Sequence, residues 1–399
     1  QDVGRESRRR ELEGCAGEVT RARHGLLISI KDLFDEAGQR TTAGSRLLAD
    51  REPAAVDAEV VRRLRAAGAL PFGRTSMSEF AYSGVGLNPH HGTPGNVFDE
   101  ARVPGGSSSG AALSVALGWC DAAIGTDTGG SVRVPAAVNG LVGFKPTQAS
   151  VPRDGVHALS DTFDSVGPLS VDLATNLRCH EVLCDVETGT FADAPLPEGP
   201  LRLAVPTGAF VDDLDASVSA AFASATSRLV DAGHTLEPLD LSAVAEAMSV
   251  VRIVVSSEAL AQYRDDLLVL ERVGDPLVLS RIRAAEGFSE DEVPAARTLQ
   301  RRIINRFSDA LDGFDALIAP TVAIDAPTIE QARRDFATVN PAMLRNATLI
   351  NLVYGCALTL PIARTEGPPG ALMVAGAGGT DARVLSAGRA IEPLMLAAR

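Results

Sequence analysis

Apolar and polar positions follow two periods along this chain, one typical of buried strands and the other of amphipathic helices. Short apolar runs bounded by turn residues predict strands, and they lie at residues 25–30, 69–72, 201–206, 234–239, 315–320, 355–360 and 370–376. Apolar residues three and four positions apart predict helices, and these segments are 55–67, 216–232 and 381–398. Because the two types alternate without a linker or repeat, we expect one large α/β domain over residues 1–399.

The predicted helix over 55–67 has the clearest pattern. Its apolar side is formed by Val56, Val60, Val61 and Leu64. Charged residues occupy the other side, and Gly68 supplies a stop signal. We therefore expect these four apolar side chains to be buried together.

Four other segments lack a strand pattern. Residues 1–24 are charged and helix-compatible, and we expect them to cover a surface. Residues 73–96 and 151–170 are polar and irregular, and both are predicted to lie over a functional site, because long loops commonly carry function. His90 and His91 in the first loop are interpreted as turn or surface residues. Residues 242–312 are rich in arginine and in helical pattern, which favours a cap that shapes a pocket.

The stretch from Gly105 to Thr147 is the one that the rest of the chain is organised around. A Gly- and Ser-rich turn at 105–110 is followed by an apolar helical segment, a strand that ends at Asp127, and a second Gly-rich turn with Ser131. A hydroxyl nucleophile needs exposure at a tight turn and N–H groups to hold an oxyanion, and glycines provide room for both. We expect the oxyanion to be held by the N–H groups of Thr128, Gly129, Gly130 and Ser131.

Composition narrows the classes of protein. A net charge of -14 over 399 residues argues against a nucleic-acid surface. The odd, scattered cysteines favour reduced thiols and a cytoplasmic protein, and they are Cys15, Cys120, Cys179, Cys184 and Cys356. The chain contains no apolar run long enough to span a bilayer, and its first residues lack a signal-peptide core. No zinc-spaced ligand set is present, so neither a metal nor a cofactor is predicted.

Lysine is nearly absent: of 37 basic residues only Lys31 and Lys145 are lysines. Lysine, unlike arginine, can lose its proton when it is desolvated and can then act as a base. Lys31 follows an apolar run and is placed for such a shift. A lysine that extends its charge from the strand end into water explains the position equally well.

Several motifs together resemble the amidase signature family of serine hydrolases. They are ISIKD around Lys31, TSMSEFAYS, GGSSSG at 105–110, GTDTGGSVRVP from Gly125, GFKPT and DALIAPT. The resemblance spans nearly the whole chain. It implies a mixed central sheet covered by helices on both faces, with residues 242–312 as a cap-like region within the domain.

The resemblance also implies a Ser-cisSer-Lys triad. Ser131 corresponds to the nucleophile, Ser107 to the bridging serine whose bond to Gly106 is cis, and Lys31 to the base. Neutral Lys31 then takes the proton of Ser107 while Ser107 takes that of Ser131, and an acyl-enzyme forms. The implied activity is hydrolysis of a small linear amide or urea-type substrate, with release of ammonia or an amine.

Neighbouring polar residues have supporting roles in this interpretation. Ser108 and Ser109 are expected to support the first turn, Asp127 to brace the second, and Lys145 to fix the GFKPT turn. Arg133 either does the same as Asp127 or faces an anionic substrate group. The expected partner is a small-molecule amide, without nucleic acid or membrane, and a homodimer is compatible with the sequence.

Three alternatives compete with this interpretation. Residues 106–110 satisfy GxSxG, but a nucleophile elbow requires a preceding strand and ARVPGG is a proline-bearing turn. The amidase component of a tRNA-dependent amidotransferase would share the triad and differ in its partner proteins. A binding module without catalysis is disfavoured because all three triad positions are filled.

Overall fold

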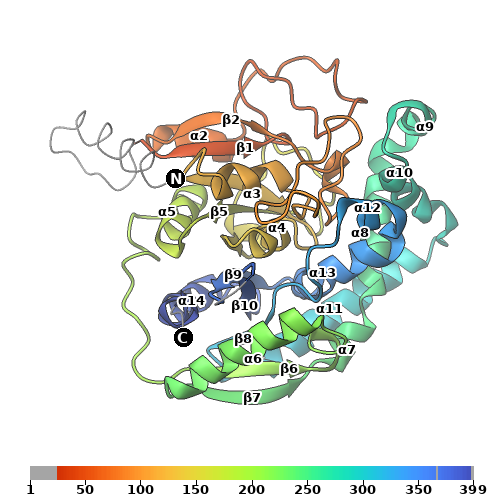
Figure 1. The fold of residues 1–399 in the computed structure, drawn as a ribbon. Coiled ribbons are helices and arrows are strands. Elements are labelled where there is room, and N and C mark those ends of the chain that lie inside the picture. Colours follow the sequence, from red (N-terminus) through yellow and green to blue (C-terminus); the bar gives the residue numbers. More distant parts are fainter. Residues whose placement is uncertain (1–24, 365–366, 397–399) are drawn as a thin grey trace.

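The structure is a computed structural model that describes residues 25–364 and 367–396. Within these residues ten strands form one sheet in the order β2-β1-β3-β5-β4-β9-β10-β8-β6-β7 (Figure 1). The strands are β1 (Leu27–Lys31), β2 (Leu70–Thr75), β3 (Ala122–Asp127), β4 (Val142–Lys145), β5 (Ser165–Ser170), β6 (Arg202–Thr207), β7 (Thr235–Asp240), β8 (Ala316–Pro320), β9 (Cys356–Ile362) and β10 (Gly370–Gly376).

The helices follow the same chain order. They are α2 (Glu59–Ala66), α3 (Ser109–Ala116), α4 (Arg133–Val138), α5 (Leu173–Cys184), α6 (Ala216–Asp231), α7 (Ser242–Glu246), α8 (Ser249–Tyr263), α9 (Leu267–Val273), α10 (Pro276–Arg283), α11 (Glu292–Ala310), α12 (Ile329–Arg334), α13 (Phe336–Leu352) and α14 (Asp381–Leu396). Short 3₁₀ turns join some of them, and one of these, η1 (Glu79–Ala81), lies in the long loop after β2.

The sheet is mixed. β1 runs parallel to β2 and β3, and β6 runs parallel to β7 and β8. The central strands are antiparallel, from β3 through β5, β4, β9 and β10 to β8. The predicted strands after residue 200 thus all join one sheet.

Helices cover both faces of this sheet (Figure 1). On one face α5, α6 and α14 enclose inward side chains of β4, β8, β9 and β10, and α2 packs against α5. On the other face α3 packs against β3 and β5, α4 packs against β4, β9 and β10, and α13 contacts α4 and β9. Alternate residues of a strand point to opposite faces, so Ala123 packs with α3 and α4 whereas its neighbour Ile124 lies in another part of the core. The predicted fold class is confirmed.

Parallel pairing of β1 and β3 sets the position of the site. Ile28 lies opposite Ala122 and Ile30 opposite Ile124, so the carboxyl ends of both strands meet at one edge. Lys31 is the last residue of β1 and Asp127 the last of β3. In α/β sheets this edge is where loops bring functional groups together.

One residue of the predicted helix over 55–67 was assigned wrongly. Val60, Val61 and Leu64 are buried on α2 as expected. Val56 precedes the helix and its side chain is 72% exposed. Val56 lies in a bend, and the helix begins only after Ala58, whose ψ of 147° is not helical and whose N–H bonds to the carbonyl of Asp35.

Several elements were not predicted. The segment 151–170, expected to be irregular, ends in the fully buried strand β5. Gly167 and Pro168 interrupt its apolar pattern, and burial on both faces removes the alternation that marks a half-exposed strand. α13 also lacked a signal, because its buried side carries Asn340, Asn346 and Asn351. The helices α4, α5 and α12 were missed as well.

Residues 242–310 are helical as expected, and α7 to α11 occupy them. The prediction for residues 1–24 falls outside the described part of the chain. Among the residues that are described, no helix has both the length and the apolar character needed to cross a membrane.

Candidate active site

Lys31 is enclosed in the protein and contacts two hydroxyl groups. Its side chain is 0% exposed, and its Nζ donates to Ser107 Oγ at 2.7 Å and to Thr126 Oγ1 at 2.9 Å. Burial lowers the pKa of Lys31 to about 7, although the carboxylates of Asp164 and Asp127 act in the opposite direction. The interpretation in which this lysine extends into water is therefore wrong.

The turn at 105–110 brings Ser107 to that amine. The peptide bond between Gly106 and Ser107 is cis, as the resemblance implied. The next two residues hold the turn in place: Ser108 Oγ donates to the Thr126 carbonyl and Ser109 Oγ to the Ser76 carbonyl, both at 3.4 Å. Their predicted supporting roles are consistent with these bonds.

The two serine-bearing turns are joined directly. The N–H of Ser108 donates to the carbonyl oxygen of Ser131 at 3.3 Å. Gly125 on β3 leaves room for the Ser108 side chain, because a Cβ at Gly125 would lie 2.7 Å from Ser108 Oγ. Ser107 and Ser131 are thus held at neighbouring positions by backbone. Among the described residues, however, no hydrogen bond joins Ser107 Oγ to Ser131 Oγ, and this link of the predicted relay is not formed here.

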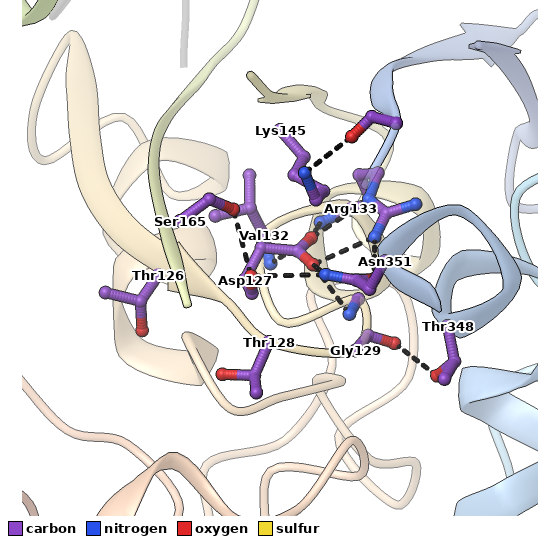
Figure 2. Close-up of polar contacts among 12 residues, drawn as sticks. Thr126, Asp127, Thr128, Gly129, Val132, Arg133, Lys145, Ser165, Thr348 and Asn351 are labelled. Atoms are coloured by element: carbon purple, nitrogen blue, oxygen red, sulfur yellow. Dashed lines mark hydrogen bonds and ion pairs between the residues drawn. The ribbon is translucent and has the colours of Figure 1, made fainter. Parts of the chain in front are cut away.

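Asp127 braces the second turn through its carboxylate (Figure 2). Its Oδ1 accepts the N–H of Gly130 at 2.8 Å, and its Oδ2 accepts the N–H of Val132 at 3.2 Å. Burial alone would raise the pKa of this carboxyl, but the adjacent Arg133 guanidinium outweighs burial and holds the pKa well below its ordinary value. These bonds support the predicted bracing role.

Arg133 is fully used by this network. Its side chain is 0% exposed, its Nη2 lies 2.8 Å from Asp127 Oδ1, and the same nitrogen donates to Asn351 Oδ1 at 2.5 Å. Asn351, on α13, returns a bond from Nδ2 to Asp127 Oδ1 at 2.9 Å (Figure 2). Of the two roles considered for Arg133, the structural one is supported, since no nitrogen faces a substrate space.

One of the four predicted oxyanion donors needs correction. The N–H of Gly130 is already bonded to Asp127, so it points into the protein rather than toward a ligand. Gly130 has φ 130°, and a Cβ would lie 2.7 Å from Ala347 Cβ, so a glycine is required. Thr128, Gly129 and Ser131 line a cavity, and Gly130 does not.

This cavity, about 380 Å³ in volume, opens beside the Ser131 turn. The long loop after β2 contributes Ala81, Tyr82 and Ser83, in agreement with its predicted position over the site. The region 242–312, expected to shape a pocket, contributes Met248, Val251, Arg252, Val255, Ser256, Ser280, Arg281 and Ala284. Helix α13, which had no signal in the sequence, contributes Phe336, Ala337, Asn340, Pro341, Leu344 and Thr348. Leu159 from the segment 151–170 completes the lining.

Three polar residues at the site were missed from the sequence. Thr126 contacts Lys31, and nothing in its strand distinguishes it from its neighbours. Asp164 accepts the Thr128 hydroxyl at 2.5 Å, and burial raises the pKa of Asp164. Thr348 donates to the Gly129 carbonyl at 2.8 Å (Figure 2). The last two come from segments far along the chain, and only the fold brings them here.

Lys145 lies behind the same network and has different partners. Its Nζ donates to the carbonyl oxygens of Pro146 and Gly355, at 2.8 and 2.7 Å. Burial and the nearby Arg133 lower its pKa to about 8. It fixes the turn after β4, as predicted.

Among the described residues, no histidine or cysteine hydrogen-bonds to Lys31, Ser107 or Ser131. His90 lies in a turn, as predicted, and its ring contacts Glu79 Oε1 at 3.0 Å. His91 is exposed as expected. Burial raises the pKa of Cys179, Cys184 and Cys356 to about 12, and Cys15 lies outside the described residues. Within the described chain no cluster of three metal-binding side chains is present.

This chain is similar to known proteins over nearly its full length. Residues 7–385 match the model of the family described as Amidase. The chain is 35% identical over 380 residues to a 2-amino-5-chloromuconic acid deaminase from Comamonas testosteroni, an alignment that covers 93% of this chain and 82% of the relative. It is 31% identical to a glutamyl-tRNA(Gln) amidotransferase subunit from Nitratidesulfovibrio vulgaris (strain DP4), over 96% and 87% of the two chains.

A solved structure confirms the similarity in three dimensions. A crystal structure of an amidase superposes with a TM-score of 0.85 and 31% sequence identity. The superposition covers 97% of this chain and 88% of that one.

Proposed function

The chain belongs to the amidase family of hydrolases that act on C–N bonds, and we propose that it cleaves a small linear amide or urea-type substrate with Ser131 as nucleophile, Ser107 as bridge and Lys31 as base. The observation that carries this proposal is the contact of 2.7 Å between Lys31 Nζ and Ser107 Oγ. It joins a lysine with a pKa of about 7 to the turn bonded to Ser131.

The proposed reaction begins with two coupled proton transfers. Neutral Lys31 accepts the proton of Ser107 while Ser107 accepts that of Ser131, and Ser131 Oγ attacks the carbonyl carbon of the substrate. The second transfer needs a Ser107–Ser131 hydrogen bond. Such bonds are commonly long or misaligned in a free enzyme and tighten when substrate binds.

Backbone N–H groups then stabilise the oxyanion. The donors proposed are those of Thr128, Gly129 and Ser131, because these residues line the cavity whereas the N–H of Gly130 is bonded to Asp127. The C–N bond breaks, and the proton held by Lys31 returns through Ser107 to the departing nitrogen. An ester remains on Ser131, and water hydrolyses it by the same relay.

A second function has a specific observation in its favour. The similarity to a glutamyl-tRNA(Gln) amidotransferase subunit extends over 96% of this chain. A protein of that kind would release ammonia from glutamine and pass it to partner proteins. The higher identity to a deaminase of a small molecule favours a free-standing enzyme, as a monomer or a homodimer.

The test is ammonia release from a panel of small amides, ureas and glutamine by the purified chain. We expect at least one small amide or urea to be hydrolysed without added proteins. Lys31→Ala and Ser131→Ala should abolish this activity, and mass spectrometry should find the acyl adduct on Ser131 only. If only glutamine is consumed, and only with partner proteins, the amidotransferase alternative is correct. If Lys31→Ala remains fully active, the proposed mechanism is wrong.

A further inference from the structure

Two arginines from the helical region reach the cavity beside Ser131. Arg252 is on α8 and Arg281 is on α10, and both line it. None of the residues lining the cavity is an aspartate or a glutamate. In a chain with a net charge of -14, this space is therefore locally cationic.

Arg281 has unused hydrogen-bonding capacity. Its Nη1 is buried and has no hydrogen-bond partner among the described residues. Neither Arg281 nor Arg252 is in an ion pair with any part of the described chain. Arg283, two positions further along α10, also has a buried nitrogen without a partner in the described residues, its Nε. It differs from Arg281 because it pairs with Glu271 at 2.5 Å and does not line the cavity. A buried donor without a partner is costly, and an incoming acceptor would remove that cost.

The Arg281 guanidinium is held in place without an acid. It lies over the ring of Tyr82, with Cζ 4.1 Å from the ring centroid. The Tyr82 hydroxyl is in turn 2.8 Å from Ser256 Oγ on α8. The ring thus connects both helices, and it leaves the edge of the guanidinium free for a ligand.

The helix that carries Arg281 is itself anchored to the loop after β2. The N–H of Asp275 donates to Glu79 Oε2 at 2.6 Å, and Asp275 caps α10 by accepting the N–H of Leu277 at 2.9 Å. Glu79 begins the turn that leads to Tyr82. The loop after β2 therefore holds both the Tyr82 ring and the start of α10, which together fix the position of Arg281.

We propose that Arg281, assisted by Arg252, binds a carboxylate of the substrate, so that the substrate class is the amide of a small organic acid whose carboxylate lies away from the scissile bond. A guanidinium presents two parallel N–H groups that match a carboxylate, and such charge-assisted pairs are stronger than neutral ones. This inference rests on the proposed function, since it assigns the substrate for the Ser131 turn in the same cavity.

The test compares acids with neutral amides of equal length. Malonamate, succinamate, glutaramate and adipamate are offered beside their methyl esters, and ammonia release is measured. We expect at least one acid to exceed its ester at least tenfold in kcat/KM. Arg281→Gln should lower kcat/KM for that acid about 10- to 100-fold, mainly through KM, and change the ester less than about threefold. Arg283→Gln, on the same helix, is the matched control and should change neither.

Equal hydrolysis of acids and esters, or equal losses for both in Arg281→Gln, would overturn the inference and leave the proposed function standing. If the wild type cleaves no amide in the panel, calorimetric binding of glutarate and adipate to Ser131→Ala decides the matter. Binding that disappears when Arg281→Gln is added supports the carboxylate site while the proposed function fails. Absence of binding overturns the site.

Discussion

Lys31 and Lys145 are the two lysines of the chain, and both are buried with lowered pKa values, yet their surroundings differ in kind. Lys31 donates to the hydroxyls of Ser107 and Thr126. Lys145 donates to the carbonyls of Pro146 and Gly355 inside the protein. A hydroxyl can give a proton to a neutral amine, whereas a carbonyl oxygen can only accept.

This difference separates a candidate base from a structural cation. Burial alone does not, because it lowers the pKa of both residues, to about 7 for Lys31 and to about 8 for Lys145. The same distinction applies to arginine. Arg133 is engaged by Asp127 and Asn351, whereas Arg281 has a buried nitrogen without a partner in the described chain.

Replacing each lysine by methionine should give the largest difference between the two sites. Lys31→Met is expected to lose roughly a thousandfold or more in kcat, because the proposed proton acceptor is removed. Lys145→Met should keep activity within about tenfold and lose about 1–3 kcal/mol of unfolding free energy, because two carbonyls lose their donor. Kinetics and urea unfolding of both variants measure this, and equal loss of activity in the two would contradict the assignment.

The difference in unfolding free energy between the wild type and Lys31→Met should depend on pH, because only the wild type has the titrating lysine. In the folded protein Lys31 protonates only below about pH 7, whereas the unfolded lysine binds its proton up to about pH 10.5. The buried lysine therefore destabilises the wild type most at and below pH 7, and this cost disappears as pH rises toward 10.5. Because methionine does not bear this cost, the free energy of unfolding of Lys31→Met, compared with that of the wild type, should be greatest at pH 6 and smallest at pH 10. Urea unfolding of both proteins at pH 6, 8 and 10 measures the difference, and a difference that does not change with pH would contradict the lowered pKa.

Asp127→Asn should have the next largest effect, on stability. It removes the charge that pairs with the fully buried Arg133, and breaking a buried pair costs about 3–5 kcal/mol. Glu237→Gln, in the exposed pair with Arg202, is the control and should leave the unfolding midpoint nearly unchanged. A midpoint for Asp127→Asn that equals the wild type would mean that the network does not support the Ser131 turn.

Thr126→Val should have the smallest effect, and it tests how the second hydroxyl beside Lys31 affects the pKa of that lysine. It removes one acceptor from the charged form of Lys31, so the pKa of Lys31 should fall further and the pH limb of kcat/KM should move to lower pH. We expect a shift of less than about one unit and a change in kcat of only a few-fold. Movement of the limb to higher pH would contradict this interpretation of the hydroxyl.

The sequence was informative where the chemistry is local. Lys31, Ser107, Asp127 and Ser131 lie in short motifs at the ends of strands or in the turns beside them, and the strands have clear apolar runs. Parallel pairing of β1 with β3 then places these motifs together.

Contacts over long sequence distances could not be predicted in this way. Asn351 and Thr348 reach the Ser131 turn from α13, whose buried asparagines remove the apolar period that would have revealed the helix. Arg281 is one arginine among many in an arginine-rich region, and only its unpartnered nitrogen at the cavity distinguishes it. The direction of the Gly130 N–H depends on the Asp127 side chain and has no sequence signal.

The most direct test of the central claim is the pH dependence of kcat/KM between about pH 5.5 and 9 for the wild type and Lys31→Met. Protonated Lys31 cannot accept a proton, so wild-type activity should rise with pH through a limb near 7 and then level off. The residual activity of Lys31→Met should lack this limb. A flat wild-type profile, or the same limb in Lys31→Met, would contradict the claim that Lys31 is the base.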